Sequence, residues 1–411
     1  MSPQTRRVRR REFLKTAAAA TAGLVIVKPE SVRGAPANSA LRVGLIGCGG
    51  RGRFVCRFFP EHTTAKIVAI ADPFRDRVER VRKELEGNKN ENIKKGTALD
   101  DAHCFVGLDS YKGLIESGVD AVLVESPPFF HPLHAAAAID AGKHVYTAKP
   151  VAVDAPGCTS IAASAEKAKS KNLSFLADFQ TSSTDFYIEA ARRVHEGAIG
   201  DPVSGQVYYI ASRLGPQADP KDKSDAARLR NWVFDKILSG DIIVEQNIHV
   251  LDVANWFLQS HPVKALGTGG RKARVDVGDC WDHFLVTYWY PNDVLMDFCS
   301  AQYTRGYDDL CCRVYGKKGT VDSHYGGPVK ITGDNPWAGG VTTNIYQDGA
   351  VANVKAFVAG IENGKPVNTG ARGAESTLTS ILGRTAAYRG AMVTWDEMMK
   401  ENAKLETTLN I

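Results

Sequence analysis

The sequence has few of the features that would place it outside the globular enzymes. Its eight cysteines include no C-x-x-C pair, and neither an H-E-x-x-H nor an H-x-x-x-H pattern occurs. The sequence therefore predicts neither a small disulfide scaffold nor a zinc site, and we expect no metal. Internal repeats are absent, and low-complexity sequence is confined to the N-terminus. With 44% hydrophobic residues, the 411-residue chain is long enough for two domains with substantial cores.

A charge bias is also lacking once the N-terminus is set aside. The formal net charge is +5, but eight almost unopposed lysines and arginines lie between residues 6 and 33. The rest of the chain is near neutral, so nothing indicates a nucleic-acid partner.

The first forty residues have the pattern of an export signal and are predicted to be signal and linker (1–40). Arg10 and Arg11 precede Glu12-Phe13-Leu14-Lys15, which matches the twin-arginine pattern. The apolar segment 16–27 is too short to span a bilayer, so no stable membrane anchor is expected. An A-x-A cleavage site at residues 35–37 would complete the signal. We therefore expect an exported or periplasmic protein that uses the twin-arginine machinery, with an uncleaved N-terminal anchor helix as the alternative.

The chain beyond the signal is organised around a glycine-rich turn. A short apolar run ends in Gly47, Gly49 and Gly52, spaced G-x-G-x-x-G, and an amphipathic segment follows. That order predicts a strand, a tight turn and a helix whose N-terminal amides receive a pyrophosphate. Gly50 and Arg51 complete the turn and are predicted to bind the cofactor as well.

A second apolar run, residues 66–71, ends at Asp72, twenty residues beyond Gly52. A carboxylate there can accept hydrogen bonds from both ribose hydroxyls of an adenosine and would repel a 2′-phosphate, so NAD is favoured over NADP. Arg75 is close enough in sequence to leave NADP open. The competing interpretation is a glycine turn in another α/β protein, with Asp72 as a helix cap.

Apolar runs and amphipathic segments alternate up to residue 154. Strands are expected at 121–125 and 143–147, and helices at 74–86, 111–116 and 131–141, with a surface loop at 87–101. This alternation predicts a doubly wound parallel sheet in a Rossmann domain, residues 41–154.

The pattern changes in residues 155–411. After a helix at 157–170, aromatic-rich runs at 203–212, 281–290, 294–302 and 310–315 follow one another without crossover helices. They predict a second α/β domain with a large, open, mainly antiparallel sheet. Residues 241–257 are predicted to form one helix.

These features together resemble the Gfo/Idh/MocA family of oxidoreductases. The matching segments are the glycine turn, Asp72, Ser126-Pro127-x-x-x-His131, residues 141–145, Lys149-Pro150, and Glu245-x-x-x-His249-x-x-Asp252. The resemblance implies an NAD-binding domain followed by a substrate domain whose open sheet often forms an oligomer interface, so a homodimer or homotetramer is expected. Two positions depart from the family pattern: Ala148 replaces the usual Glu before Lys149, and Glu245 replaces the usual Asp.

Hydride transfer from a secondary alcohol requires a group that removes the hydroxyl proton. The resemblance points to His249 as the general base, with Lys149 sharing the proton and also facing the cofactor. Glu245 and His249 are spaced i, i+4, so on one helix they would share a face, and Glu245 would orient His249 or bind a hydroxyl.

Further site residues are predicted with less support from pattern. Ser126, Pro127 and His131 are expected to line the nicotinamide side, and Trp232 to stack on the cofactor or on a sugar. Asp235, Tyr303 and Arg305 are weaker substrate candidates, chosen only for their places in expected cleft loops.

The sequence accordingly favours an NAD-dependent oxidoreductase that acts on a secondary hydroxyl of a sugar or polyol and holds its cofactor tightly. Two alternatives remain: an NAD-dependent glycosidase or lyase that oxidises the ring transiently, and a sugar-binding relative without turnover.

Overall fold

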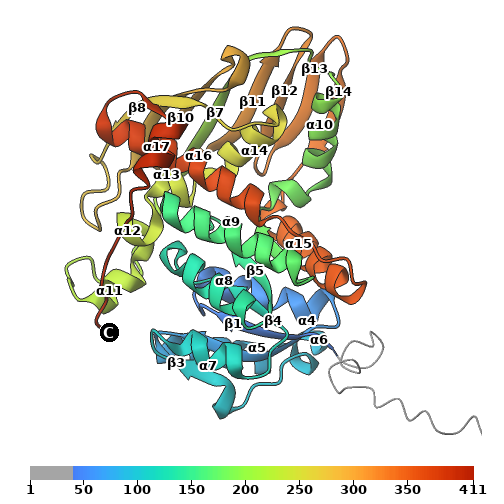
Figure 1. The fold of residues 1–411 in the computed structure, drawn as a ribbon, viewed down its shortest axis with the longest axis vertical. Coiled ribbons are helices and arrows are strands. Elements are labelled where there is room, and N and C mark those ends of the chain that lie inside the picture. The colour runs from blue at the N-terminus through green and yellow to red at the C-terminus, as the bar shows by residue number, and fades with distance from the viewer. Residues whose placement is uncertain (1–39) are drawn as a thin grey trace, which may run out of the picture. The chain divides into compact units, whose positions relative to one another are not determined.

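The computed structural model describes residues 40–411, and the predicted signal, including Arg10, Arg11 and residues 16–37, lies outside the described residues. Figure 1 shows two sheets with helices packed on and between them. In the described part of the chain, no helix is both long and apolar enough to cross a membrane.

The first sheet has six strands in the order β3-β2-β1-β4-β5-β6, and every neighbouring pair is parallel. Its strands are β1 (Arg42–Ile46), β2 (Lys66–Asp72), β3 (Cys104–Val106), β4 (Ala121–Val124), β5 (His144–Ala148) and β6 (Phe175–Asp178). Strand β4 is buried throughout, as expected of a central strand covered on both faces. The predicted doubly wound sheet is confirmed.

Helices connect these strands. They are α3 (Gly50–Cys56), α4 (Phe58–His62), α5 (Arg75–Glu86), α6 (Glu91–Lys95), α7 (Ser110–Glu116), α8 (His131–Asp140) and α9 (Ala155–Ser170). The loop predicted at 87–101 is wrong in part, because it contains α6. The side chain of Asn90 caps this short helix by accepting from Asn92 N, and Ile93 anchors it in the core.

The predicted domain boundary at residue 154 precedes the last strand of the first sheet, since β6 follows α9. The second half of the chain also contributes to this core: α15 (Ile345–Glu362) contacts α4 and β6, and Phe357 packs edge-on against Phe59 and Tyr146. The division at residue 154 stays a prediction.

The second sheet has nine strands in the order β14-β13-β12-β11-β7-β10-β9-β8-β15. Their bounds are β7 (Pro202–Ser212), β8 (Lys264–Gly270), β9 (His283–Trp289), β10 (Leu295–Thr304), β11 (Asp309–Gly316), β12 (Gly319–His324), β13 (Pro328–Gly333), β14 (Trp337–Val341) and β15 (Val393–Thr394). All neighbours are antiparallel except β7 and β10, which run parallel. The predicted mainly antiparallel sheet is confirmed.

One face of the second sheet packs on helices. These are α10 (Asp185–His195), α14 (Ile248–Leu258) and α16 (Gly370–Arg389), and α16 also contacts α9, which joins the two halves. On the other face, apolar side chains are left in solvent: Leu285 is 52% and Leu295 40% exposed.

The helix predicted at 241–257 is interrupted, which corrects the sequence interpretation. Helix α13 (Ile242–Glu245) ends at Glu245, and α14 begins at Ile248. Glu245 and His249 therefore do not share one continuous helix.

Candidate active site

The glycine-rich turn joins β1 to α3 at the carboxyl edge of the first sheet. Gly47 has φ +98° and donates from its amide to Ala71 O at 2.8 Å. A Cβ on Gly52 would overlap the carbonyl oxygen of Gly47, whereas a Cβ on Gly49 would meet no atom within 4 Å. Gly47 and Gly52 are thus required by the turn itself, and Gly49 faces open space that a phosphate can fill.

Gly49 borders a cavity that continues to Asp72, which we call the glycine-turn cavity. Its wall includes Gly47, Gly49, Asp72, Phe74, Arg77, Tyr111, Glu125, Ser126, Pro127, His134, Leu229 and Trp232. Asp72 is buried, and its two carboxylate oxygens accept from Cys48 N and Phe74 N, each at 2.8 Å. Burial raises the pKa of Asp72. These two hydrogen bonds from backbone amides fix the carboxylate beside the space that a ribose would fill.

The positive charge of Arg77 acts against the rise in the pKa of Asp72. Arg77 lines the glycine-turn cavity beside Asp72, and its guanidinium lies 5.1 Å from the ring centre of Phe74. Arg75, which the sequence suggested as the group that could accept a 2′-phosphate, does not line the cavity. The fixed carboxylate of Asp72 therefore fits a dinucleotide with free ribose hydroxyls, and Arg77 is the wall cation with which a 2′-phosphate could pair.

A second cavity, which we call the lysine cavity, adjoins the first. Its wall includes Arg51, Glu125, Ser126, His131, Lys149, Asp178, Gln180, Tyr209, Trp232, Glu245, His249 and Tyr346. Glu125, Ser126 and Trp232 line both cavities, so the two meet at these residues.

Lys149 and Glu245 meet across the lysine cavity. The ammonium group of Lys149, just after β5, donates to the backbone oxygen of Glu245 and lies 3.3 Å from its carboxylate. Both side chains are largely buried, so this pair is screened less by solvent than a surface pair would be.

His249 enters the same cavity from the first turn of α14. Burial lowers its pKa well below the usual value, and the positive charges of Lys149 and Arg51 lower it further. The ring is therefore neutral, and its buried Nδ1 has no hydrogen-bond partner in the described structure. A neutral imidazole with a free nitrogen can accept a proton from a bound hydroxyl. The structure thus brings Lys149, Glu245 and His249 together.

Arg51 takes a different position from the one expected of a phosphate ligand. It lines the lysine cavity, forms an ion pair with buried Asp178, and stacks 4.7 Å from the ring centre of Tyr346. Its second terminal nitrogen, Nη1, is buried without a partner. Gly50 likewise does not line the glycine-turn cavity, although a Cβ there would meet no atom.

The residues predicted beside the nicotinamide lie at the junction or next to it. Ser126 and Trp232 line both cavities, Pro127 the glycine-turn cavity, and His131 the lysine cavity. The ring nitrogens of His131 lie 2.8 Å from Pro150 O and 2.6 Å from Ser126 O. His131 therefore ties together the loops that follow β4 and β5.

The three weaker substrate candidates line neither cavity, and their role stays a prediction. Asp235 caps α12 (Lys236–Ser239) through Ile237 N and Leu238 N and pairs with Arg228. Tyr303 is 42% exposed, and Arg305 belongs to the exposed turn after β10. Position in an expected loop did not indicate the direction of these side chains.

Several residues of the lysine cavity were missed by sequence reasoning. Asp178 ends β6, Gln180 follows it, Tyr209 lies on β7, and Tyr346 lies in the first turn of α15. Asp178 could have been found, because it ends a strand of the parallel sheet, where ligands bind. Nothing local marks Tyr346, which comes from a helix far along the chain.

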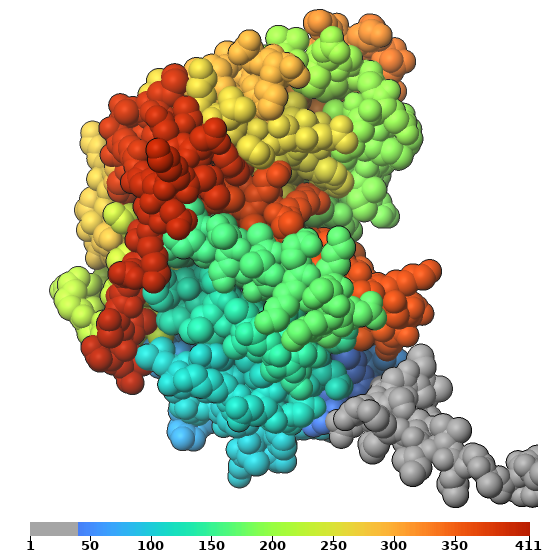
Figure 2. Space-filling view, in the orientation of Figure 1, coloured from blue at the N-terminus to red at the C-terminus, as the bar shows by residue number. Residues whose placement is uncertain are grey.

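A segment from the second half of the chain covers the glycine-turn cavity. Leu229 of α11 (Asp225–Arg230) and Trp232 line it, and Arg230 pairs with Asp76 of α5 at 2.6 Å while stacking 3.9 Å over Phe74. The C-terminal segment of the chain, drawn in red, lies beside α11, drawn in yellow-green, in Figure 2. There Asn410 N donates to Asp225, and Arg228 donates to Thr407, each at 2.8 Å.

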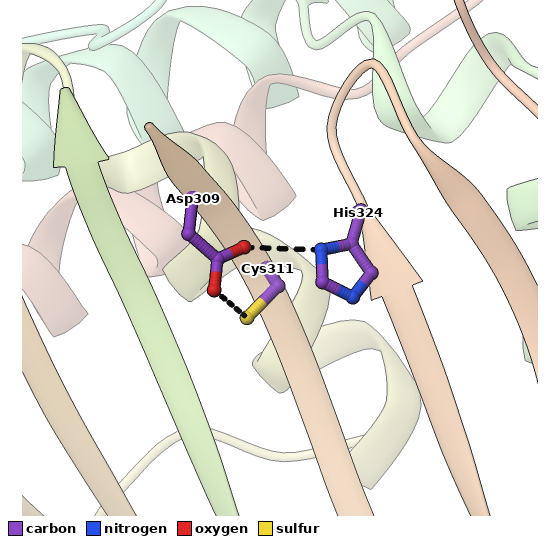
Figure 3. A group of neighbouring side chains, drawn as sticks. All are labelled: Asp309, Cys311 and His324. Atoms are coloured by element: carbon purple, nitrogen blue, oxygen red, sulfur yellow. Dashed lines mark hydrogen bonds and ion pairs between the residues drawn. The ribbon is translucent and has the colours of Figure 1, made fainter. Parts of the chain in front are cut away.

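One cluster of metal-ligand residue types lies elsewhere, on β11 and β12 (Figure 3). Nδ1 of His324 lies 3.0 Å from Asp309, and its Nε2 lies 3.1 Å from Asp322, which also binds Arg313. Both ring nitrogens of His324 thus have carboxylate partners, and one of these carboxylates also binds Arg313. The expectation of no metal stays a prediction.

Two family models match the chain, one over each half of the described structure. Residues 41–175 match the family model described as the oxidoreductase family with an NAD-binding Rossmann fold, and residues 187–322 match the GFO/IDH/MocA C-terminal domain. The chain belongs to the Gfo/Idh/MocA family. The family resemblance inferred from the sequence is confirmed. The prediction of an NAD-dependent oxidoreductase is confirmed with it.

Relatives of known name are distant. Inositol 2-dehydrogenase 1 of Saccharopolyspora erythraea is 28% identical over 285 residues, which cover 68% of this chain and 73% of that protein. A glycosyl hydrolase family 109 protein of Shewanella sp. (strain MR-4) is 28% identical over 223 residues, covering 49% of this chain and 46% of that protein. Scyllo-inositol dehydrogenase from Lactobacillus casei, solved with NAD(H) and scyllo-inositol, has a TM-score of 0.66 at 19% identity, covering 87% of this chain and all (100%) of that one.

Proposed function

We propose that this family member oxidises a secondary hydroxyl of a cyclic polyol or sugar to the ketone, or reduces that ketone to the hydroxyl. The observation that carries the proposal is that buried His249 and the Lys149–Glu245 pair line one cavity, which shares wall residues with the glycine-turn cavity. The named relatives that act on inositols support a polyol substrate for this chain.

Three residues of the chain have separate roles at the oxygen of the substrate hydroxyl. The ammonium group of Lys149 donates to the hydroxyl oxygen and stabilises the charge that develops there as the proton leaves. His249 takes that proton on its imidazole ring, and Glu245 holds Lys149 in place through the 3.3 Å contact. Nicotinamide supplies the hydride acceptor or donor when it is bound.

A panel of inositols, aldoses and deoxy sugars, added to dinucleotide-loaded protein, tests this function. Nicotinamide absorbance should change with at least one ring polyol that carries a free secondary hydroxyl, and the matched deoxy compound should give no change. A response to none of the polyols would remove the proposal.

For cofactor preference, we predict tighter binding of NAD than of NADP, by about tenfold or more, because the fixed Asp72 carboxylate opposes a 2′-phosphate. Asp72→Asn should narrow that gap by weakening NAD binding, whereas Asp101→Asn, at an exposed surface pair, should leave it unchanged. Calorimetric titration of both dinucleotides into apo protein measures the gap. Tighter binding of NADP by the wild type would contradict the role given to Asp72.

We also propose that the cofactor is held tightly, because α11 covers the glycine-turn cavity and Arg230 fastens it to α5. Arg230→Gln removes one partly exposed ion pair and one cation–π contact, so we expect dinucleotide dissociation to speed up about threefold to tenfold. Stopped-flow release measures the rate. Arg192→Gln, which removes a surface arginine that pairs within α10, is the control and should not change it.

Export through the twin-arginine machinery is proposed from the sequence alone. Arg10→Lys together with Arg11→Lys should trap precursor in the cytoplasm, while Arg6→Lys with Arg7→Lys should export normally. Fractionation followed by immunoblotting reads the outcome. An unchanged periplasmic yield from the first variant would refute the signal.

A homodimer or homotetramer is proposed from the open face of the second sheet, where Leu285 and Leu295 are exposed. Light scattering gives the mass in solution. A monomer at micromolar concentration would contradict the proposal.

Glycoside cleavage by transient ring oxidation is the second candidate function, favoured by the partial match to a glycosyl hydrolase family 109 protein. It predicts release of the aglycone from a nitrophenyl glycoside with no net change in nicotinamide absorbance. A dehydrogenase instead gives a net absorbance change and an oxidised sugar.

A further inference from the structure

Among residues 40–411, Glu125 is the one acidic residue that lines both cavities, and the proton path described above does not use it. It follows β4 directly, and its amide donates to Ile46 O at 2.8 Å, so the backbone is held against β1. The residue is only 9% exposed. Both carboxyl oxygens are buried without a hydrogen-bond partner in the described structure. A buried carboxyl group without a partner is costly unless a ligand completes it.

The position of Glu125 is set by the switch point of the parallel sheet. Strands β1 and β4 are neighbours there, and the chain turns in opposite directions on leaving them. A dinucleotide crosses this point in passing from the glycine turn toward Lys149. Val124 pairs with Thr147, so Glu125 lies level with Ala148, the position at which the sequence departs from the family's usual Glu.

The charged and titratable groups that face Glu125 come from three neighbouring elements. They are Arg51 and Cys56 of α3, Tyr146 and Lys149 at β5, and Asp178 at the end of β6. None of them hydrogen-bonds to the carboxyl group. Arg51 pairs with Asp178 through Nη2 while its Nη1 stays unpaired, and Lys149 pairs with Glu245. The carboxyl group is therefore left for a ligand at the junction.

We propose that Glu125 faces the nicotinamide end of the bound dinucleotide and, when ionised, favours the positively charged oxidised form over the neutral reduced form. This inference rests on the proposed function. The ionised carboxylate can accept a hydrogen bond from the N–H₂ of a carboxamide, and a negative charge in a buried position attracts a cationic ring strongly. Glu125 would then act as a positioning residue that biases the enzyme toward binding NAD⁺.

The pH dependence follows from the charge of Glu125. Burial raises its pKa to about 8, so in the free protein it is protonated at lower pH. Bound NAD⁺ would lower that pKa, so NAD⁺ binding should release a proton below about pH 8 and tighten as pH rises. NADH carries no ring charge, so its binding should not. His131 and His134, whose pKa values burial lowers to about 4 and 3, do not titrate in this range.

Calorimetric titration of NAD⁺ and NADH between about pH 6 and pH 9 tests the proposal. In the wild type the ratio Kd(NAD⁺)/Kd(NADH) should fall about tenfold up to about pH 8 and then level off. In Glu125→Gln the ratio should be flat, and Glu84→Gln, at an exposed ion pair, should behave as the wild type. Repeating the wild-type titration in buffers of different ionisation enthalpy counts the released proton without any variant.

The outcomes separate this inference from the proposed function. A wild-type ratio that does not change with pH, or the same slope in Glu125→Gln, would overturn the role of Glu125 even if polyol oxidation is found. Failure of the wild type to bind either dinucleotide would overturn the proposed function together with this inference.

Discussion

Lys149→Ala and His249→Ala should each lower turnover about 10²–10⁴-fold, which is the usual contribution of a general acid or base. Dinucleotide affinity should change by no more than about threefold, because neither side chain lines the glycine-turn cavity. The two groups lie in one cavity, and in the proposed mechanism they act on one proton, so the double variant should be scarcely slower than either single variant. Single-turnover hydride transfer, followed by nicotinamide absorbance, measures each rate.

Two matched variants sharpen this experiment. Lys143→Ala removes a lysine that precedes the same strand and donates to Val119 O away from the cavity, so its rate should be near that of the wild type. Glu245→Gln keeps the backbone oxygen that accepts from Lys149 and should be milder than either alanine variant. Near-normal rates in both alanine variants would mean that the chemistry lies elsewhere, and the non-catalytic sugar binder would then be the better interpretation.

Gly52→Ala should abolish dinucleotide binding and also destabilise the protein. The new methyl group would overlap the carbonyl oxygen of Gly47 and lie 3.1 Å from Cβ of Glu125, and neither neighbour can move without opening the turn. Overpacking of this kind costs about 1–3 kcal/mol or more in the free energy of unfolding. Thermal unfolding and calorimetric titration of NAD measure the two effects.

The other glycines of the turn separate folding from binding. Gly49→Ala should unfold like the wild type, because its Cβ meets no atom within 4 Å, yet it should weaken NAD binding about tenfold to a hundredfold by filling the space left for phosphate. Gly50→Ala, which also meets no atom and does not line the cavity, should change both properties least. Equal loss of binding in all three variants, or in none, would contradict this assignment of the turn.

The parts of the site that could be predicted from sequence are those in which neighbouring residues determine geometry. Gly47, Gly49 and Gly52 shape one turn, and Asp72 is fixed by the end of the next strand, so spacing alone located them. The parallel sheet was predictable for the same reason, because each strand and helix in the alternation has its own local sequence pattern. Lys149 and His249 needed the family resemblance as well, since the residues alone did not distinguish a catalytic histidine from a core one.

The rest depends on contacts between distant segments. Tyr346, Asp178 and Arg51 meet only because α15 returns to the first sheet, and no local pattern reports that return. Glu125 is distinguished by a carboxyl group that is buried without a hydrogen-bond partner. The sequence does not show which groups surround a residue at the end of a strand, because that depends on where the neighbouring strands lie. The break between α13 and α14 was hidden because the apolar residues on both sides continue a helical pattern.

The central claim is that Lys149 and His249 move a hydroxyl proton while bound NAD exchanges a hydride with a ring polyol. Single-turnover absorbance of NAD-loaded wild type, Lys149→Ala and His249→Ala with an active polyol tests it most directly. The account predicts a fast change in the wild type and a change at least about a hundredfold slower in each variant, with NAD still bound. Equal rates in all three proteins would contradict it.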